Sequence, residues 1–204
     1  DTVVLCNASV EEKTPPHVPE GHGWVTAEYS MLPRANRERS RRDIDKLKLS
    51  GRSAEIQRLI GRSLRSAVDR EALGERTITV DCDVLQGDGG TRTASVTGGF
   101  VALALACRKL LAEGKVMRDP IIHQVAAVSA GIIDEVPVLD LPYSEDSRAQ
   151  VDLNCVMNEK GELIELQGTG EGRSFTLSEQ QELVRLCAKG IRELMEKQRE
   201  ILQR

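Results

Sequence analysis

A glycine turn followed by hydroxyl and guanidinium side chains is the clearest place in this sequence where chemistry is suggested. Residues 87–90 form the turn, and Thr91 and Arg92 follow it directly. Backbone N–H groups at such a turn and the start of a helix favour an anion, and an arginine adds a two-pronged donor for phosphate. The pattern therefore predicts a phosphate site. It is equally typical of an ordinary strand-to-helix turn, with Thr91 as the helix cap and Arg92 in solvent.

Three aspartates form a second group. Asp140, Asp146 and Asp152 recur at intervals of six residues, in a region that otherwise alternates like a β-strand. Taken alone, such aspartates are typical of solvated turn residues.

The most basic part of the chain is a charge-dense run over residues 34–48. Because repeated guanidinium groups bind successive backbone phosphates without recognising the base sequence, this run predicts an RNA-binding surface. A solvated charged loop is the alternative. The net charge of the whole chain is −4, so a nucleic-acid surface would have to be local. The predicted RNA-binding residues are Arg34, Arg37, Arg39, Arg41 and Arg42.

Cysteine and histidine usage excludes several site types. The five cysteines are scattered singly and the three histidines lie at no metal-ligand spacing to them, so neither a zinc site nor a histidine triad is predicted. We expect reduced, mostly buried thiols. We find no apolar run of roughly 18 residues and no secretory leader, and we expect a cytoplasmic protein without a membrane partner.

Hydrophobic periodicity predicts alternating strands and helices, which is an α/β pattern. Gly51 opens a helix, with Ser53 as its expected cap, and a loop rich in Pro, Gly and charge is expected over 11–23. We expect strands over 2–6, 24–28 and 77–85, helices over 53–68, 91–111 and 178–203, and two antiparallel pairs, 125–133 with 138–141 and 151–158 with 163–167.

Several of these segments together resemble the ribonuclease PH family. The segments are Trp24–Tyr29, Met31–Arg34, Gly51–Arg62, Val80–Leu85, Gln86–Ser95, Asp140–Leu141 and Glu165–Thr169, in the family's order and with nearly its spacing. The resemblance covers essentially the whole chain. It departs from the family in the loop over 11–23 and in the spacer over 41–50.

The resemblance implies the ribonuclease PH fold, in which mixed β-sheets pack against helices in two βαβ-type halves. It also implies one domain over residues 1–204. The family has about thirty residues before the position of Asp1, so we expect this sequence to lack them, which would leave 2–6 as an exposed edge strand. Family members assemble as hexamers, as a trimer of dimers, and we expect a homo-oligomer.

For the site, the resemblance implies that Arg52, Thr91 and Arg92 bind inorganic phosphate, with further donors from Ser95 and the backbone of Gly90. It implies that Asp146 and Asp152 are the catalytic carboxylates and hold a divalent metal, expected to be Mg²⁺. Asp146 could alternatively protonate the leaving group. The arginines at 34–42 would bind tRNA, and those at 58 and 62 would extend that surface or form salt bridges between subunits.

The activity implied is a phosphate-dependent 3′→5′ exoribonuclease that trims tRNA 3′ ends and releases nucleoside 5′-diphosphates. Inorganic phosphate is then the co-substrate, tRNA precursors and other RNA 3′ ends are the partners, and DNA is not expected. The alternative is a catalytically silent RNA-binding or scaffold subunit of an exosome-like ring. Such subunits tend to lose the phosphate arginines or the aspartates, whereas all five residues are present here.

Overall fold

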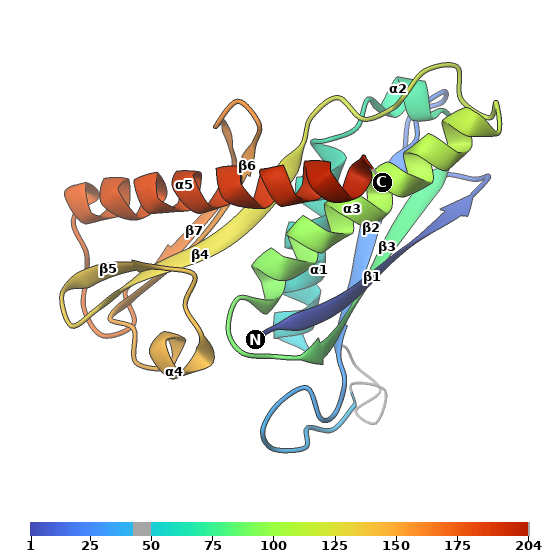
Figure 1. The fold of residues 1–204 in the computed structure, drawn as a ribbon. Coiled ribbons are helices and arrows are strands. Elements are labelled where there is room, and N and C mark those ends of the chain that lie inside the picture. The colour runs from blue at the N-terminus through green and yellow to red at the C-terminus, as the bar shows by residue number, and fades with distance from the viewer. Residues whose placement is uncertain (43–49, 204) are drawn as a thin grey trace.

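The computed structural model describes residues 1–42 and 50–203 and contains two β-sheets, each packed against helices (Figure 1). Lys46 and Lys48, which belong to the predicted basic run, lie outside the described residues.

The first sheet has the order β1-β3-β2 and is mixed. β1 (Val3–Glu11) pairs antiparallel with β3 (Thr77–Gln86), and β2 (Trp24–Met31) pairs parallel with β3. A parallel pair needs a crossover, which α1 (Gly51–Arg65) and the short α2 (Arg70–Leu73) supply. Alternate residues of β3, including Ile78 and Val80, are fully buried beneath the helices, and this period of two fixes the sheet's inner face.

The second sheet has the order β5-β4-β6-β7, and all its pairs are antiparallel. Its strands are β4 (Val125–Ile133), β5 (Val136–Leu139), β6 (Val151–Asn158) and β7 (Leu163–Thr169). One turn of helix, α4 (Tyr143–Asp146), lies between β5 and β6, and α5 (Leu177–Leu202) ends the fold. Every residue of β4 is buried, because Ala126 and Val128 face the core beneath α5 while Val125 and Ala127 face the first half.

Helix α3 (Thr91–Ala112) joins the halves, since it contacts β1, β3, α1, β4 and α5 (Figure 1). Contrary to the expectation that no apolar run is long enough, α3 has the length and hydropathy that would allow it to span a membrane. Its contacts with both sheets explain this apolar composition, because a helix packed on several sides needs apolar residues around most of its surface.

The predicted α/β class, the loop before β2 and both antiparallel pairs are confirmed. Two details are wrong. The cap of α1 is Ser50, whose hydroxyl accepts a hydrogen bond from the Ser53 backbone. A βαβ unit is present in the first half, β2-α1-β3, but the described second half is an antiparallel sheet without one.

All five cysteines are free thiols, and four of them are buried, as predicted. Burial raises the pKa of Cys107 to about 12, so this thiol stays protonated at neutral pH.

Candidate active site at the seam between the two halves

A polar cavity of about 350 Å³ lies where the first turn of α3 meets the second sheet. The two halves contribute opposite charges to it, arginines from α1 and α3 and carboxylates from α4 and β6. Its lining residues are Arg52, Arg92, Asp146, Ser147, Ala149, Asp152, Asn154, Gln167, Thr169 and Glu171. The cavity therefore brings together four of the five residues predicted for phosphate binding and catalysis.

Arg92 is held in place by partners from both halves. Its Nη1 donates to Gln167 Oε1 at 2.9 Å and lies 3.4 Å from Glu55 Oε1, while Gln167 Nε2 donates to the same Glu55 oxygen at 3.0 Å. The side chain is 18% exposed, so its guanidinium is largely fixed but still reaches the cavity. Arg52, at the start of α1, is exposed and lines the same cavity.

The start of α3 has the geometry of an anion site. Its N-cap is Gly90, at φ +56°, which provides no side-chain acceptor for the first N–H groups of the helix. Those groups and the helix dipole would stabilise a negative charge placed there. The alternative in which Thr91 caps the helix is therefore wrong.

The hydroxyl of Thr91 faces the core. Its Oγ1 lies 2.9 Å from the buried Tyr29 hydroxyl, and Thr91 does not line the cavity. Burial raises the pKa of Tyr29, although the Thr91 contact and the positive charges of Arg52 and Arg92 act in the opposite direction. Ser95 is also in the core, where its hydroxyl donates to the Thr91 carbonyl, so it lies away from the cavity as well.

The carboxylates form the opposite wall. Asp152 lies on β6, and Asp146 ends the single turn of α4. Burial raises the pKa of Asp152, and the negative charge of Asp146 raises it further, while the charge of Arg92 and hydrogen bonds from Asn154 Nδ2 at 3.2 and 3.4 Å oppose the rise. A carboxylate close enough to raise the pKa of Asp152 by its charge is also close enough to share a bound cation with it.

The donors present fit a magnesium ion. Mg²⁺ prefers oxygen ligands, commonly one or two carboxylates completed by water and substrate oxygens, and Asp146 and Asp152 supply that number. Among the described residues no cluster of three or more metal-ligating side chains occurs, so the substrate would have to complete the coordination.

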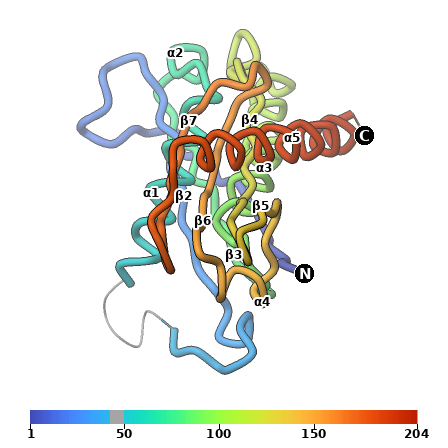
Figure 2. Tube along the Cα trace, turned by 90° about the vertical axis from the view of Figure 1, so that its left-hand side faces the viewer, coloured from blue at the N-terminus to red at the C-terminus, as the bar shows by residue number. Residues whose placement is uncertain are grey.

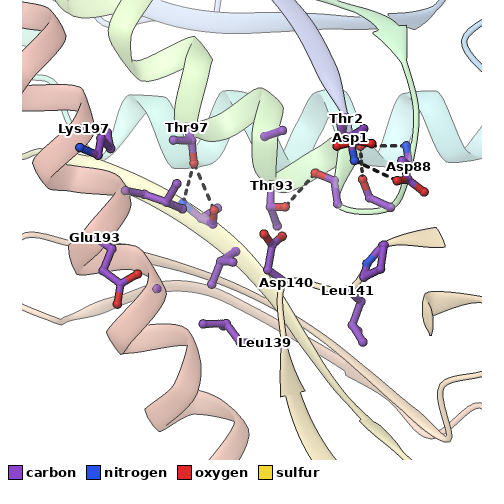
Figure 3. Close-up of a pocket in the computed structure, with 18 residues that line it drawn as sticks. Asp1, Thr2, Asp88, Thr93, Thr97, Leu139, Asp140, Leu141, Glu193 and Lys197 are labelled. Carbon is purple, nitrogen blue, oxygen red and sulfur yellow. Dashed lines mark hydrogen bonds and ion pairs between the residues drawn. The ribbon is translucent and has the colours of Figure 1, made fainter. Parts of the chain in front are cut away.

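Asp140 does not join the other two aspartates. It lines a larger cavity, of about 590 Å³, between α3, α5 and β5 (Figure 3). In this cavity its carboxylate lies beside Gly90 and Thr93, whereas Asp152 lines the smaller cavity. The equal spacing of the three aspartates in the sequence therefore does not correspond to one cluster.

The predicted RNA-binding arginines, all exposed, lie on the loop after β2. The Ala35 carbonyl in this loop accepts a hydrogen bond from Gly87 N at 2.8 Å, which ties the loop to the glycine turn. The loop and α4 lie at the same end of the molecule in both views (Figure 1, Figure 2). Arg62 instead forms a two-pronged ion pair with Glu165, at 2.9 and 3.2 Å, within the chain.

Sequence reasoning missed the residues that position the predicted ones, although periodicity could have found them. Glu55 lies three residues after Arg52 on one helix face, and Asn154 lies two residues after Asp152 on one strand face. The register pairs Asn154 with Gln167 and Asp152 with Thr169, so two adjacent strands present one polar row.

The chain matches two family models, described as the 3′ exoribonuclease family, domain 1, over residues 1–109, and domain 2, over residues 123–189. It is 55% identical over 203 residues to ribonuclease PH of Syntrophomonas wolfei, covering 99% of this chain and 85% of that protein. It is 54% identical over 204 residues to ribonuclease PH of Bacillus mycoides, covering 99% and 83%.

Solved structures share the fold at low sequence identity. A chain of the Archaeoglobus fulgidus exosome, solved with RNA bound to the active site, superposes with a TM-score of 0.80 at 20% identity, covering 97% of this chain and 79% of that one. Rice Rrp46 superposes with a TM-score of 0.75 at 14% identity, covering 99% and 84%. With both family models matched in order and more than half of its residues identical to those of full-length relatives, the chain belongs to the ribonuclease PH family of 3′ exoribonucleases.

Proposed function

We propose that this protein is a phosphorolytic 3′→5′ exoribonuclease that removes nucleotides from tRNA 3′ ends. The observation that carries the proposal is the cavity in which Arg52 and Arg92 face Asp146 and Asp152. Phosphate and an RNA linkage are both anions, so fixed positive charge must hold them together before they can react. The relatives above 50% identity carry the name ribonuclease PH.

In the proposed reaction an oxygen of inorganic phosphate attacks the phosphorus of the last internucleotide linkage. The bond from that phosphorus to the 3′ oxygen of the preceding nucleotide breaks, and this oxygen takes up a proton. The terminal nucleotide leaves as a nucleoside 5′-diphosphate, and the RNA is one nucleotide shorter with a free 3′ hydroxyl. Arg52, Arg92 and the first N–H groups of α3 orient the attacking phosphate.

Asp146 and Asp152 would hold a magnesium ion at the other wall. When bound, such an ion offsets the negative charge on the oxygens of the transferred phosphoryl group and on the leaving oxygen. Asn154, which donates to Asp152, keeps that carboxylate oriented toward the cavity. Asp146 as the proton donor to the 3′ oxygen is the alternative role for that residue.

The exposed arginines at 34–42 would hold the RNA backbone as it approaches the cavity. Their attachment to the glycine turn through the Gly87–Ala35 hydrogen bond supports this placement. The shared fold with exosome core chains supports a ring-forming oligomer, and we assign a homohexamer built as a trimer of dimers. Cytoplasmic location follows from the proposed role in tRNA maturation.

One experiment tests the activity. The protein is incubated with a tRNA precursor carrying a few extra 3′ nucleotides, with magnesium, in the presence and absence of phosphate, and the released products are identified. Nucleoside 5′-diphosphates formed only with phosphate, and re-added to RNA when diphosphates are in excess, are expected. Release of 5′-monophosphates without phosphate would overturn the phosphorolytic assignment, and binding without any release would indicate the silent subunit.

A further inference from the structure

The glycine turn and the segment that carries Asp146 lie in direct backbone contact. Gly89, at φ +76°, approaches residues 141–143 so closely that a Cβ on it would overlap the Leu141 carbonyl oxygen and lie 3.1 Å from Tyr143 N. Figure 3 shows Asp88 and Leu141 on the two sides of this contact. The phosphate side and the carboxylate side of the proposed site therefore meet at this point.

The single turn of α4 has no cap of its own. Its N-cap is Pro142, which has no side-chain acceptor, and the first N–H of the helix, from Tyr143, donates instead to Asp88 Oδ1 at 3.1 Å. The cap thus comes from a residue 55 positions earlier in the chain and from the other half of the fold. A one-turn helix has little stability of its own, so an outside acceptor matters more here than on a long helix.

Asp88 is itself held in position. Its backbone N–H donates to Thr2 Oγ1 at 2.8 Å, and Thr2 Oγ1 in turn donates to the Gly89 carbonyl at 2.5 Å. These contacts leave Oδ1 directed at Tyr143.

We propose that Asp88 is a positioning residue that caps α4 and thereby fixes Asp146 relative to the phosphate-binding end of α3. The inference rests on the proposed function, because it assumes that Asp146 acts on the reaction. Asp88 does not line the cavity that holds Arg52, Arg92 and the two carboxylates, so it acts only through the turn it holds. A loss of positioning should lower kcat and leave substrate binding unchanged, since the arginines that bind phosphate stay where they are.

The test compares Asp88→Ala and Asp88→Asn in phosphorolysis, with phosphate varied at saturating RNA. The alanine removes the acceptor, and a lost cap should lower kcat about tenfold. The asparagine loses the negative charge but keeps an oxygen toward Tyr143 N, so it should restore kcat to within about twofold of the wild type. The KM for phosphate should stay unchanged in both variants.

Asp69→Ala is the matched control. Asp69 caps the equally short α2 in the same way, accepting from the N–H groups of Glu71 and Ala72 at 3.0 and 3.1 Å, and it also pairs with Arg118, away from the cavity. This variant should lower the unfolding temperature without lowering kcat. It separates a loss of stability from a loss of positioning.

Amide hydrogen exchange of residues 141–149 provides a readout that does not depend on activity. Exchange there should become faster in Asp88→Ala, and it should stay at the wild-type rate in Asp88→Asn and Asp69→Ala. Unchanged exchange in Asp88→Ala, or equal loss of kcat in both Asp88 variants, would overturn the inference. If the wild type releases no nucleoside diphosphates, the proposed function fails, and if Asp146→Asn keeps the wild-type rate, Asp146 does not act on the reaction. In either case the exchange data still decide whether Asp88 holds α4.

Discussion

Replacing Arg92 by alanine should weaken the binding of phosphate far more than it affects any other step of the reaction. The guanidinium is largely shielded from water and is fixed by Gln167 and Glu55. A hydrogen bond to a charged group in such a place contributes about 1.5 to 3 kcal/mol, which corresponds to a rise in the KM for phosphate of roughly 10- to 150-fold.

The neighbouring carboxylate pushes the expected value toward the upper end of that range. The Glu55 carboxylate lies 3.4 Å from the Arg92 guanidinium. When the guanidinium is removed, the negative charge of Glu55 would repel the incoming phosphate. Arg92→Lys keeps the charge but not the planar fork, so its KM should fall between those of the wild type and the alanine variant.

The assay measures nucleoside diphosphate release against phosphate concentration at saturating RNA. Arg185→Ala is the control, because Arg185 is an exposed arginine of α5 that pairs with Glu182 on the same helix. Its KM should match that of the wild type. If Arg92→Ala left the KM for phosphate within about twofold of the wild type, Arg92 would not belong to the phosphate site.

Four further predictions concern the carboxylates, the glycine turn and the basic loop. Asp146→Asn and Asp152→Asn should each lower turnover at least about a hundredfold while RNA affinity in filter binding stays unchanged, and near wild-type rates would contradict their role. Burial and the charge of Asp146 raise the pKa of Asp152, so the ionised carboxylate destabilises the fold above that pKa. Asp152→Asn should therefore raise the unfolding temperature at pH 7. This rise in unfolding temperature should shrink as the pH falls toward the ordinary aspartate pKa, and a constant rise would oppose the reasoning. Gly89→Ala should lower the unfolding temperature more than Gly21→Ala, because both positions have φ near +75° but only Gly89 has backbone where a Cβ would lie; equal shifts would argue against the close contact. Arg37→Ala and Arg39→Ala should each reduce the slope of log affinity for single-stranded RNA against log salt by about 0.7, and an unchanged slope would mean that the loop does not contact the backbone phosphates.

Local patterns in the sequence were sufficient for most of the elements. Period-two alternation located β3 and the two antiparallel pairs, and the apolar spacing of α5 located the last helix, because each pattern reflects burial of one face. The topology of the second half was not predictable in the same way. The βαβ unit expected there came from the family resemblance, and it is absent because α3 and α5 cover the antiparallel sheet rather than connect parallel strands.

The site residues, like the elements, were predictable where local sequence patterns were sufficient and not where residues distant in the chain determine the placement. Arg52, Arg92, Asp146 and Asp152 were named from the sequence, and the structure places them on one cavity. Asp140 was grouped with the other aspartates by spacing alone, yet the positive φ of +58° at this residue turns the chain so that it lies in the other cavity. The Thr91 hydroxyl was misplaced because its partner, Tyr29, lies 62 residues earlier, a separation that no local pattern encodes.

The contacts between the two halves of the fold also constrain how this sequence can evolve. Its key contacts each join one residue from either side of the chain's midpoint: Arg92 with Gln167, Arg62 with Glu165, and Asp88 with the Tyr143 backbone. For the two side-chain pairs, a substitution on one side is compensated by a compatible change of its counterpart, whereas Asp88 must keep an acceptor for the backbone of Tyr143. Exchanging whole halves between distant relatives should fail for this reason, even when each half keeps its own core, and function should return when the seam residues are exchanged as matched pairs.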